Sequence, residues 1–525
     1  MASLSSPDPI VGRSPGRNAA FFAFGLLAVA LAFRLEGFLA NGVAALLNPY
    51  ELDYGEGIVW QQMRMMFDGR GYMPIDGFPS IVFHYPPLYH AATHAATHAG
   101  SALGLDPLIA GRTVSLVSTL IAALLIGAIT SLLMEREARR VRLICASTAA
   151  ILALSWFPVL SWAPLMRVDM LACALSLAGL LLAIGSLDRP GLIYPAALLF
   201  VAAVYTKQTM IAAPTAAFGT LLLIRPGLAA RGIATAILMG LSALALLTIG
   251  TDGGFIRHVF LYNVNRFEAG QLLQVLESTA YHAVYMGMAA IGVFALVGQL
   301  RASVRGNDNR GQLFRRIAAN RQASRALILL AYLAITTPML ITSGKVGSSV
   351  NYQIEWMFAL SIFAGISLAP GARALLSSEG RHGTSLLHAC LIPGAIALQS
   401  MILLHSPYSS SSTPELGLEM DRLGEEIQRA RQPIISDNMV LLLKNKREVV
   451  WEPAIFAELA STGVYDEKPF VRKILNRDFA FFVTFGDRGD SRFDERYNPA
   501  VADAIDAAYP VKQLYGNWTV RRPRP

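Results

Sequence analysis

Long apolar runs separated by short polar segments dominate the first four fifths of the chain. Many of these runs reach the roughly 17–25 residues that cross a bilayer as a helix. We count eleven, the first from about Ala19 to Leu39 and the last ending near His405, with the two short runs that meet at Lys207 counted separately. The pattern predicts a polytopic α-helical membrane domain over residues 1–405.

One interval between apolar runs, residues 47–107, carries far more polar residues than the others in the first half. Within it, Ile58–Phe67 has apolar residues at helical spacing and few charges, which predicts a helix lying on the membrane surface. Pro86 and Pro87 can begin a further helix that runs to about Leu103. We therefore expect a large loop outside the membrane rather than an additional span.

The tail, residues 406–525, has no long apolar run. Short β-type runs alternate with helical stretches, which is typical of a small α/β domain. The expected strands are Pro433–Ser436, Glu448–Trp451 and Phe479–Thr484, and the expected helices are Ala454–Ser461 and Pro469–Asn476. No glycine pattern of the kind that binds nucleotides occurs in this tail.

Arginine is concentrated in particular loops, and this sets the orientation. Glu135–Arg142 holds four Arg and two Glu, and Arg301–Arg325 holds seven Arg and one Asp. Such loops face the cytoplasm. The loop 47–107 and the tail then lie outside, and the N-terminus lies inside.

Composition agrees with this class of protein. The chain of 525 residues is 54% hydrophobic and 15% charged, with a mean hydropathy of +0.45. A soluble globular protein has nearer ~25% charged residues. The net charge of +8 follows from arginine in cytoplasmic loops, so we expect no nucleic-acid partner. All three cysteines fall in apolar runs, and nothing suggests a disulfide framework.

Polar residues that stand out from the apolar background lie mainly in loops on the outer side. They are Asp53, Glu56, His84, Arg167, Asp169, Lys207, Arg257, His258, Arg266 and Lys345. Acids and cations from distant loops that converge at the membrane surface suit transfer of a group from a lipid phosphate. A carboxylate takes a proton from the incoming hydroxyl, and cations stabilise the leaving phosphate.

Each residue also has a structural explanation. Asp53 and Asp169 stand where helices begin, and Asp is a favoured N-cap. Glu56 competes with Asp53 as the base. Lys207 lies between two short apolar runs, where an unpaired charge is costly. Arg266 and Lys345 fit ordinary surface positions as well.

Metal binding stays open at this stage. His90, His94 and His98 are four residues apart, on one helical face, which is a spacing that can bind metal. Their Ala-Ala-Thr-His repeat also suits the polar face of an interfacial helix. The acids Asp53 and Asp169 could hold a divalent cation, so no cofactor is assigned and no metal ligand is named.

Several short motifs together resemble the membrane glycosyltransferases of the GT-C fold. They are an acid shortly after the first span, Pro86-Pro87-Leu88-Tyr89 before the second, Asp169 opening the fourth, Tyr205–Thr209, and Asn263–Phe267. Their order, from about Asn48 to Asn351, is similar to glycosyltransferase family 39. That family is the group of protein O-mannosyltransferases and lipid A aminoarabinose transferases.

The resemblance implies an inverting transfer of a sugar from a polyprenyl-phosphate donor, with no bound nucleotide. The acceptor would be an envelope glycan, lipid or protein, and the location a bacterial cytoplasmic (inner) membrane, in contact with its lipids. Asp53 or Glu56 would be the base, Asp169 would assist it, and Lys207 and Arg266 would bind donor phosphate or sugar. His84, Arg167, His258 and Lys345 complete the expected donor-binding set.

Two departures from the family pattern leave questions open. The family usually has adjacent Asp and Glu, whereas Tyr54 and Gly55 separate Asp53 from Glu56 here. The aminoarabinose enzymes have Lys before the double proline, where this chain has Tyr85. Two other functions remain as alternatives, a transporter or flippase of lipid-linked substrates and a non-catalytic subunit of an envelope glycan assembly complex.

Overall fold

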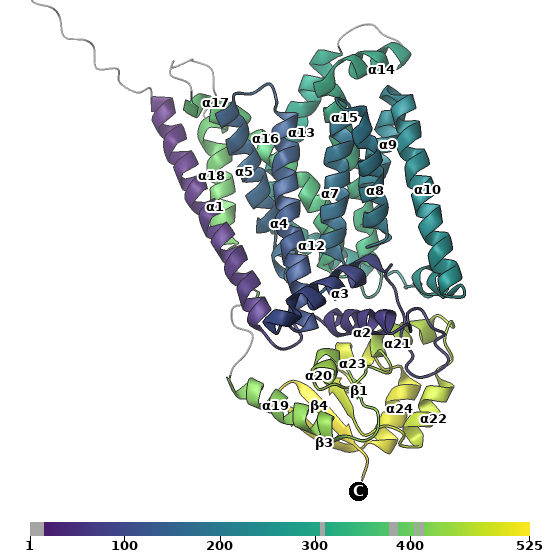
Figure 1. The fold of residues 1–525 in the computed structure, drawn as a ribbon. Helices are drawn as coiled ribbons and strands as arrows, with labels where there is room; N and C mark the ends of the chain where they lie inside the picture. Colours follow the sequence, from purple (N-terminus) through teal and green to yellow (C-terminus); the bar gives the residue numbers. More distant parts are fainter. Residues whose placement is uncertain (1–14, 305–309, 377–386, 404–406, 409–413, 525) are drawn as a thin grey trace, which may run out of the picture.

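A bundle of long helices forms most of the molecule, and a smaller unit with a β-sheet covers one end of it (Figure 1). The structure is a computed structural model that describes residues 15–304, 310–376, 387–403, 407, 408 and 414–524. Figure 1 places α14 and α17 at the end of the bundle opposite the C-terminal unit. Here the C-terminal unit means residues 414–522.

Eleven helices among the described residues correspond to the eleven apolar runs. They are α1 (Pro15–Leu47), α4 (Pro107–Leu133), α5 (Arg139–Ser155), α7 (Asp169–Gly185), α8 (Ile193–Val204), α9 (Ala212–Ile224), α10 (Pro226–Gly250), α13 (Ala283–Ser303), α15 (Arg321–Met339), α16 (Ile354–Ser367) and α18 (Ile392–Ile402). Within the described ranges, six helical segments are long and apolar enough to cross a membrane. The expectation of a polytopic helical membrane protein is confirmed.

Helix α16 lies at the centre of the bundle and α10 at its edge. Every residue of α16 is buried, whereas α10 exposes large apolar residues such as Leu246 and Ile249. An apolar helix surface exposed in this way suits contact with lipid rather than water. The local sequence determines where α4 begins. The Asp106 side chain caps the helix by accepting a hydrogen bond from the Ile109 N–H (2.9 Å), and Pro107 is the first helical residue.

The first loop contains two helices that lie across the end of the bundle (Figure 1). They are α2 (Gly55–Phe67) and α3 (Leu88–Gly100), and a 3₁₀ turn, Ser101–Leu103, extends α3 as expected. The predicted surface helix Ile58–Phe67 forms within α2, but it is covered by protein. Ten of the thirteen residues of α2 are buried, because the C-terminal unit packs on the side facing away from the bundle.

Shorter elements connect the bundle helices. The α-helical ones are α6 (Phe157–Trp162), α11 (Gly254–Ile256), α12 (Ala269–Ala280), α14 (Arg310–Ala319) and α17 (Ala369–Leu376). The 3₁₀ and π turns are Pro190–Leu192, Arg257–Leu261, Leu340–Gly344, Val350–Gln353 and Leu387–Leu391.

The C-terminal unit is a four-stranded sheet with helices. Its elements are α19 (Pro414–Arg429), β1 (Ile435–Ser436), α20 (Met439–Lys444), α21 (Pro453–Ser461), α22 (Lys468–Leu475), β2 (Phe482–Phe485), α23 (Ser491–Asp494), α24 (Pro499–Ala508), β3 (Val511–Tyr515) and β4 (Trp518–Arg522). The strand order is β1-β2-β4-β3, with β1 parallel to β2 and the other pairs antiparallel.

One predicted strand of this unit is wrong, and two of its strands were not predicted. The run Glu448–Trp451 is not a strand of the sheet, since Trp451 makes only an isolated bridge to Ser80 in the first loop. Strands β3 and β4 were not expected, and they form a hairpin around the turn at Gly516. The mostly exposed β3 lacks the apolar run by which strands are recognised.

A shared apolar core joins the C-terminal unit to the first loop. Val59 and Met63 of α2 belong to the same buried cluster as Met439, Leu442 and Val483 of the C-terminal unit. The unit therefore packs directly on the loop that carries Asp53 and Glu56.

Candidate active site

Asp53 lies in the turn before α2 and forms an ion pair with Arg167. Arg167 Nη1 is 3.0 Å from Asp53 Oδ1, which also accepts the Gly55 N–H at 3.0 Å. No described residue donates a hydrogen bond to Oδ2, and the Asp53 side chain is 24% exposed. Burial raises the pKa of Asp53 above its ordinary value, and the Arg167 guanidinium opposes this rise. This carboxylate has an oxygen available to accept a proton.

Gly55 lets this ion pair form. A Cβ added to Gly55 would lie 1.2 Å from Arg167 Nη1, so any other residue would push the guanidinium away from Asp53. A glycine is therefore required at position 55, because a side chain there would occupy the space of the Arg167 guanidinium.

Glu56, the competing base, is fully buried and fully hydrogen-bonded. Its Oε1 accepts from Arg112 Nε (2.7 Å) and the Met166 N–H (3.0 Å), and its Oε2 accepts from Arg112 Nη2 (2.7 Å) and the Leu52 N–H (2.9 Å). Arg112 is also fully buried and donates to backbone carbonyls at the end of α1 and in the first loop. Both oxygens of Glu56 are therefore occupied by donors that hold the loop, α4 and the segment before α7 together.

Asp169 is the first residue of α7 and binds side chains from three other segments. Its Oδ1 accepts from Lys207 Nζ (2.6 Å) and Asn351 Nδ2 (2.8 Å), and its Oδ2 accepts from Trp162 Nε1 (2.8 Å). The residue before it, Val168, is the N-cap, and Asp169 has no described role as a helix cap. Asp169 therefore positions Lys207 rather than the start of its own helix.

Lys207 follows α8 and is almost completely buried. Burial lowers the pKa of its ammonium, but the Asp169 carboxylate and the Tyr352 and Tyr85 side chains outweigh this and raise that pKa above its ordinary value. The Nζ atom also lies 4.6 Å from the centre of the Tyr352 ring. Lys207 thus remains charged in an apolar setting, which suits binding of an anionic group.

Trp162 connects the two acid–base pairs. Its ring nitrogen donates to Asp169, and Arg167, the partner of Asp53, lies with its Cζ 5.2 Å from the centre of the Trp162 ring. Asp53, Arg167, Trp162, Asp169 and Lys207 form one continuous set of contacts. The structure thus brings together two acids and two cations from three separate segments of the chain.

Two cavities share the Lys207 side chain. The larger, of about 260 Å³, is lined by His84, Tyr85, Lys207, Gln208, Thr209, Val259, Phe260, Asn263, Asn265, Lys345, Val346, Gly347, Ser348 and Tyr352. The smaller, of about 20 Å³, is lined by Asp169, Cys173, Lys207, Thr209, Met210, Thr336, Met339, Thr342, Asn351, Tyr352, Glu355 and Trp356. Neither lining includes Asp53.

The walls of the larger cavity combine cations with neutral donors. Lys345 and Lys207 supply positive charge. Burial raises the pKa of the Tyr85 phenol, which keeps it protonated, and burial lowers the pKa of His84 to about 4, which keeps it neutral. His84 Nε2 contacts the Tyr262 carbonyl at 3.1 Å. This set suits an anion with hydroxyl groups.

Three residues expected to bind the donor do not line the larger cavity, and one of them is Arg167, which pairs with Asp53. The other two are Arg266 and His258. Arg266 forms an ion pair with Glu458 of α21 (Nη2–Oε2, 2.9 Å), its side chain is 56% exposed, and it does not line the cavity. His258 is buried, its Nδ1 accepts the Phe83 N–H (3.1 Å), and its Nε2 donates to the Met73 carbonyl (2.8 Å). Both side chains hold the loops together.

The three histidines of α3 do not converge. His90 is buried beside Gln62 (Nε2–Oε1, 3.2 Å), while His94 and His98 are paired through Nε2 atoms 3.0 Å apart near the surface. Within the described ranges, no cluster of three or more His, Cys, Asp or Glu residues is arranged to hold a metal ion. Asp53 and Asp169 each have a basic partner of their own.

Sequence reasoning did not single out Trp162, Asn351, Tyr85 and Tyr352 as site residues. Each lies in a segment already assigned to the outer side, but none carries a charge that would distinguish it from ordinary loop residues. Their proximity to Lys207 and Asp169 depends on how the helices pack.

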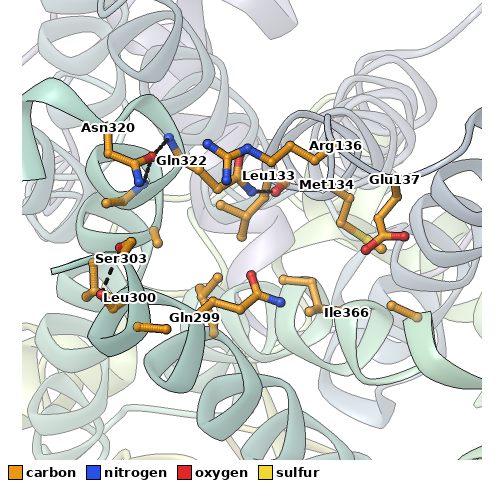
Figure 2. A pocket seen from close by; sticks show the side chains of 15 residues that line it. Leu133, Met134, Arg136, Glu137, Gln299, Leu300, Ser303, Asn320, Gln322 and Ile366 are labelled. Atoms are coloured by element: carbon orange, nitrogen blue, oxygen red, sulfur yellow. Dashed lines mark hydrogen bonds between the residues drawn. The ribbon is translucent and has the colours of Figure 1, made fainter. Parts of the chain in front are cut away.

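A further cavity lies away from this site. It has a volume of about 450 Å³ and lies between the α4–α5 connection, α13, α15 and α16 (Figure 2). The labelled side chains around it include Arg136, Gln299, Gln322 and Leu300. None of the acids and cations named for the active site lines it.

No protein-family model matches the chain, and no curated protein matches it by sequence. Several solved structures are similar to it. ArnT from Cupriavidus metallidurans, bound to undecaprenyl phosphate, is similar with a TM-score of 0.54 and 15% identity, covering 96% of this chain and 98% of that chain. The Archaeoglobus fulgidus oligosaccharyltransferase in its apo form has a TM-score of 0.55 and 11% identity, covering 88% and 69%.

A third similar structure is the archaeal oligosaccharyltransferase AglB from Archaeoglobus fulgidus, in complex with an inhibitory peptide and a dolichol-phosphate. Its TM-score is 0.51 at 12% identity, with 88% of this chain and 69% of that chain covered. At these identities the similarity concerns the arrangement of helices and not individual side chains. The chain has the GT-C fold of membrane glycosyltransferases.

Proposed function

We propose that the protein is an integral-membrane glycosyltransferase that moves a sugar from a polyprenyl-phosphate donor to an acceptor outside the cytoplasmic membrane. One observation carries this proposal. The buried, charged Lys207 faces a cavity and is linked through Asp169, Trp162 and Arg167 to Asp53, a carboxylate with a free oxygen. An anion site and a base in one connected set match the needs of this transfer.

The 260 Å³ cavity is the proposed site of the donor phosphate and its sugar. Lys207 and Lys345 would bind phosphate oxygens as point charges, and Tyr85 would donate a hydrogen bond. Asp169 and Asn351 keep the Lys207 side chain in position, so little reorganisation is needed when the phosphate binds. Arg266 and His258 are left out of this proposed donor site.

The proposed chemistry is a single displacement at the anomeric carbon. Asp53 Oδ2 takes the proton from the acceptor hydroxyl or amine, whose oxygen or nitrogen forms the new bond to carbon. The bond between that carbon and the phosphate oxygen breaks on the opposite face, so the configuration inverts. The electron pair leaves with polyprenyl phosphate, and Lys207 and Lys345 stabilise the charge on it.

The distribution of arginine supports placing this site outside the cytoplasm. The arginine-rich helix α14 is at the end of the bundle opposite the C-terminal unit (Figure 1). Since such segments remain in the cytoplasm, the site and the C-terminal unit would lie on the outer side. The expected location is the cytoplasmic membrane of a bacterium.

The similar structures support a lipid-linked donor. One holds undecaprenyl phosphate, and another holds a dolichol-phosphate together with a peptide. The acceptor is proposed as an envelope glycan, a lipid or a protein. Residues 1–405 would bind the donor, and residues 406–525 would complete the outer face of the site.

The direct test uses the purified protein in lipid nanodiscs with a panel of labelled polyprenyl-phosphate sugars and an envelope extract as acceptor. We expect labelled product and released polyprenyl phosphate, both abolished by Asp53→Asn. Arg488→Ala, which removes a solvent-exposed ion pair with Asp503 inside the C-terminal unit, is the matched control. Movement of the donor across proteoliposome membranes without any product would contradict the proposal and favour a transporter.

A further inference from the structure

The residues on both sides of Asp53 are bonded to the C-terminal unit. The Tyr54 hydroxyl accepts the Ala454 N–H at 3.2 Å, and Arg496 lies with its Cζ 4.1 Å from the centre of the Tyr54 ring. Two residues before Asp53, Glu51 Oε2 accepts the Val440 N–H at 3.2 Å. The turn that carries Asp53 is thus attached to the C-terminal unit at each end.

Arg496 itself is fixed from inside the C-terminal unit. Its Nη1 lies 3.1 Å from Oδ2 of the fully buried Asp437. That carboxylate also accepts the Tyr497 hydroxyl (3.0 Å) and the Phe485 N–H (2.8 Å). Because Asp437 holds the guanidinium, the cation over the Tyr54 ring has a defined position relative to the sheet.

Helix α2, which begins directly after this turn, packs closely against the C-terminal unit. A Cβ added to Gly57 would lie 2.5 Å from the Met439 Cβ, so α2 and α20 are in close contact. Further along α2, Gln61 Nε2 donates to Glu448 Oε1 at 3.1 Å. In Figure 1, α2 lies between the bundle and the C-terminal unit. Contacts with the C-terminal unit therefore hold both the turn that carries Asp53 and the helix that follows it.

We propose that the C-terminal unit is a positioning element for catalysis, in which Arg496 acts through Tyr54 to hold Asp53 in its active orientation. This inference rests on the proposed function, because it assumes that Asp53 is the base. Arg496 and Tyr54 touch neither cavity. They act by restricting the turn rather than by contacting the donor.

The test compares variants at Tyr54, which leave the buried pair of Asp437 and Arg496 intact. Tyr54→Leu removes both the ring under the cation and the hydroxyl, whereas Tyr54→Phe keeps the ring. For Tyr54→Leu we expect kcat to fall about 10- to 100-fold, as small misplacements of a catalytic group do, with an unchanged KM for the donor. Tyr54→Phe should retain most of the activity, and Arg488→Ala serves as the control for general destabilisation of the unit.

Hydrogen exchange gives a second measurement that needs no activity. The Glu56 N–H donates to the Asp53 carbonyl (2.9 Å) and the Gly55 N–H to Asp53 Oδ1 (3.0 Å), so both amides report on the turn. Tyr54→Leu should speed exchange at these amides, and Arg488→Ala should not.

Wild-type exchange and wild-type kcat in Tyr54→Leu would overturn the positioning role, and so would equal losses in Tyr54→Leu and Arg488→Ala. A wild-type protein that transfers no sugar would instead refute the proposed function, and the exchange measurement would still decide whether the unit restrains the turn.

Discussion

The two acids of the first loop should respond in opposite ways to loss of their charge. Asp53→Asn should abolish transfer and leave the fold intact, whereas Glu56→Gln should destabilise the fold. The difference follows from the environments of the two carboxylates, one with a free oxygen and one with both oxygens fully used. The comparison tests the choice of base that the sequence leaves open.

The magnitudes can be worked out from the hydrogen bonds. In Glu56→Gln an amide NH₂ replaces one of two oxygens that together accept four N–H donors, so Arg112 loses part of its buried partner. Breaking a buried pair in this way costs about 3–5 kcal/mol. Asp53→Asn keeps an oxygen that can accept from Arg167 and Gly55 and leaves no additional donor unpaired, so it should destabilise the fold less than Glu56→Gln does. Losing the base lowers kcat by about 10²–10⁴-fold.

The assay measures thermal unfolding and sugar transfer on the same nanodisc preparations of the wild type and both variants. We expect a lowered Tm for Glu56→Gln and an unchanged Tm with little transfer for Asp53→Asn. The reasoning would be refuted by the reverse result, in which Glu56→Gln is stable but inactive and Asp53→Asn transfers sugar at the wild-type rate.

Three further predictions concern charge. Lys207→Ala should raise the donor KM more than it lowers kcat, since it removes a cation from the proposed phosphate site, and an unchanged KM in initial-rate kinetics would count against that role. On the acid side, kcat should decrease around a pKa above the ordinary ~3.9 of Asp, because burial raises the pKa of Asp53 and only the ionised carboxylate accepts a proton. A kcat that stays constant down to pH 4 would contradict this. In the folded protein, burial lowers the pKa of His258 to about 4, whereas in the unfolded chain this pKa is near ~6.5. The unfolded state therefore binds the proton first as the pH falls, so the free energy of unfolding should decrease between pH 6.5 and pH 4. Chemical denaturation at several pH values should show a weaker decline for His258→Gln, and an equal decline would contradict the assignment.

Hydropathy and charge in the chain are enough to predict the helical bundle. Membrane-spanning runs are long and continuous, and a bilayer accepts few other backbone structures, so eleven helices are recognised without knowledge of their contacts. The loops with Asp53, Asp169 and Lys207 are identified in the same way, because charged residues are rare in an apolar chain. The weaker β signals of the C-terminal unit account for the two strands that were not expected.

The roles of the individual acids depend on packing between segments far apart in the chain. Asp53 and Glu56 are three residues apart and chemically alike, yet Arg112 from α4 occupies both oxygens of Glu56 and Arg167 occupies one of Asp53. Trp162 and Asn351 reach Asp169 only in the folded bundle. Local sequence shows where charges occur along the chain, but partners and burial are set by long-range contacts, and these determine which carboxylate can accept a proton.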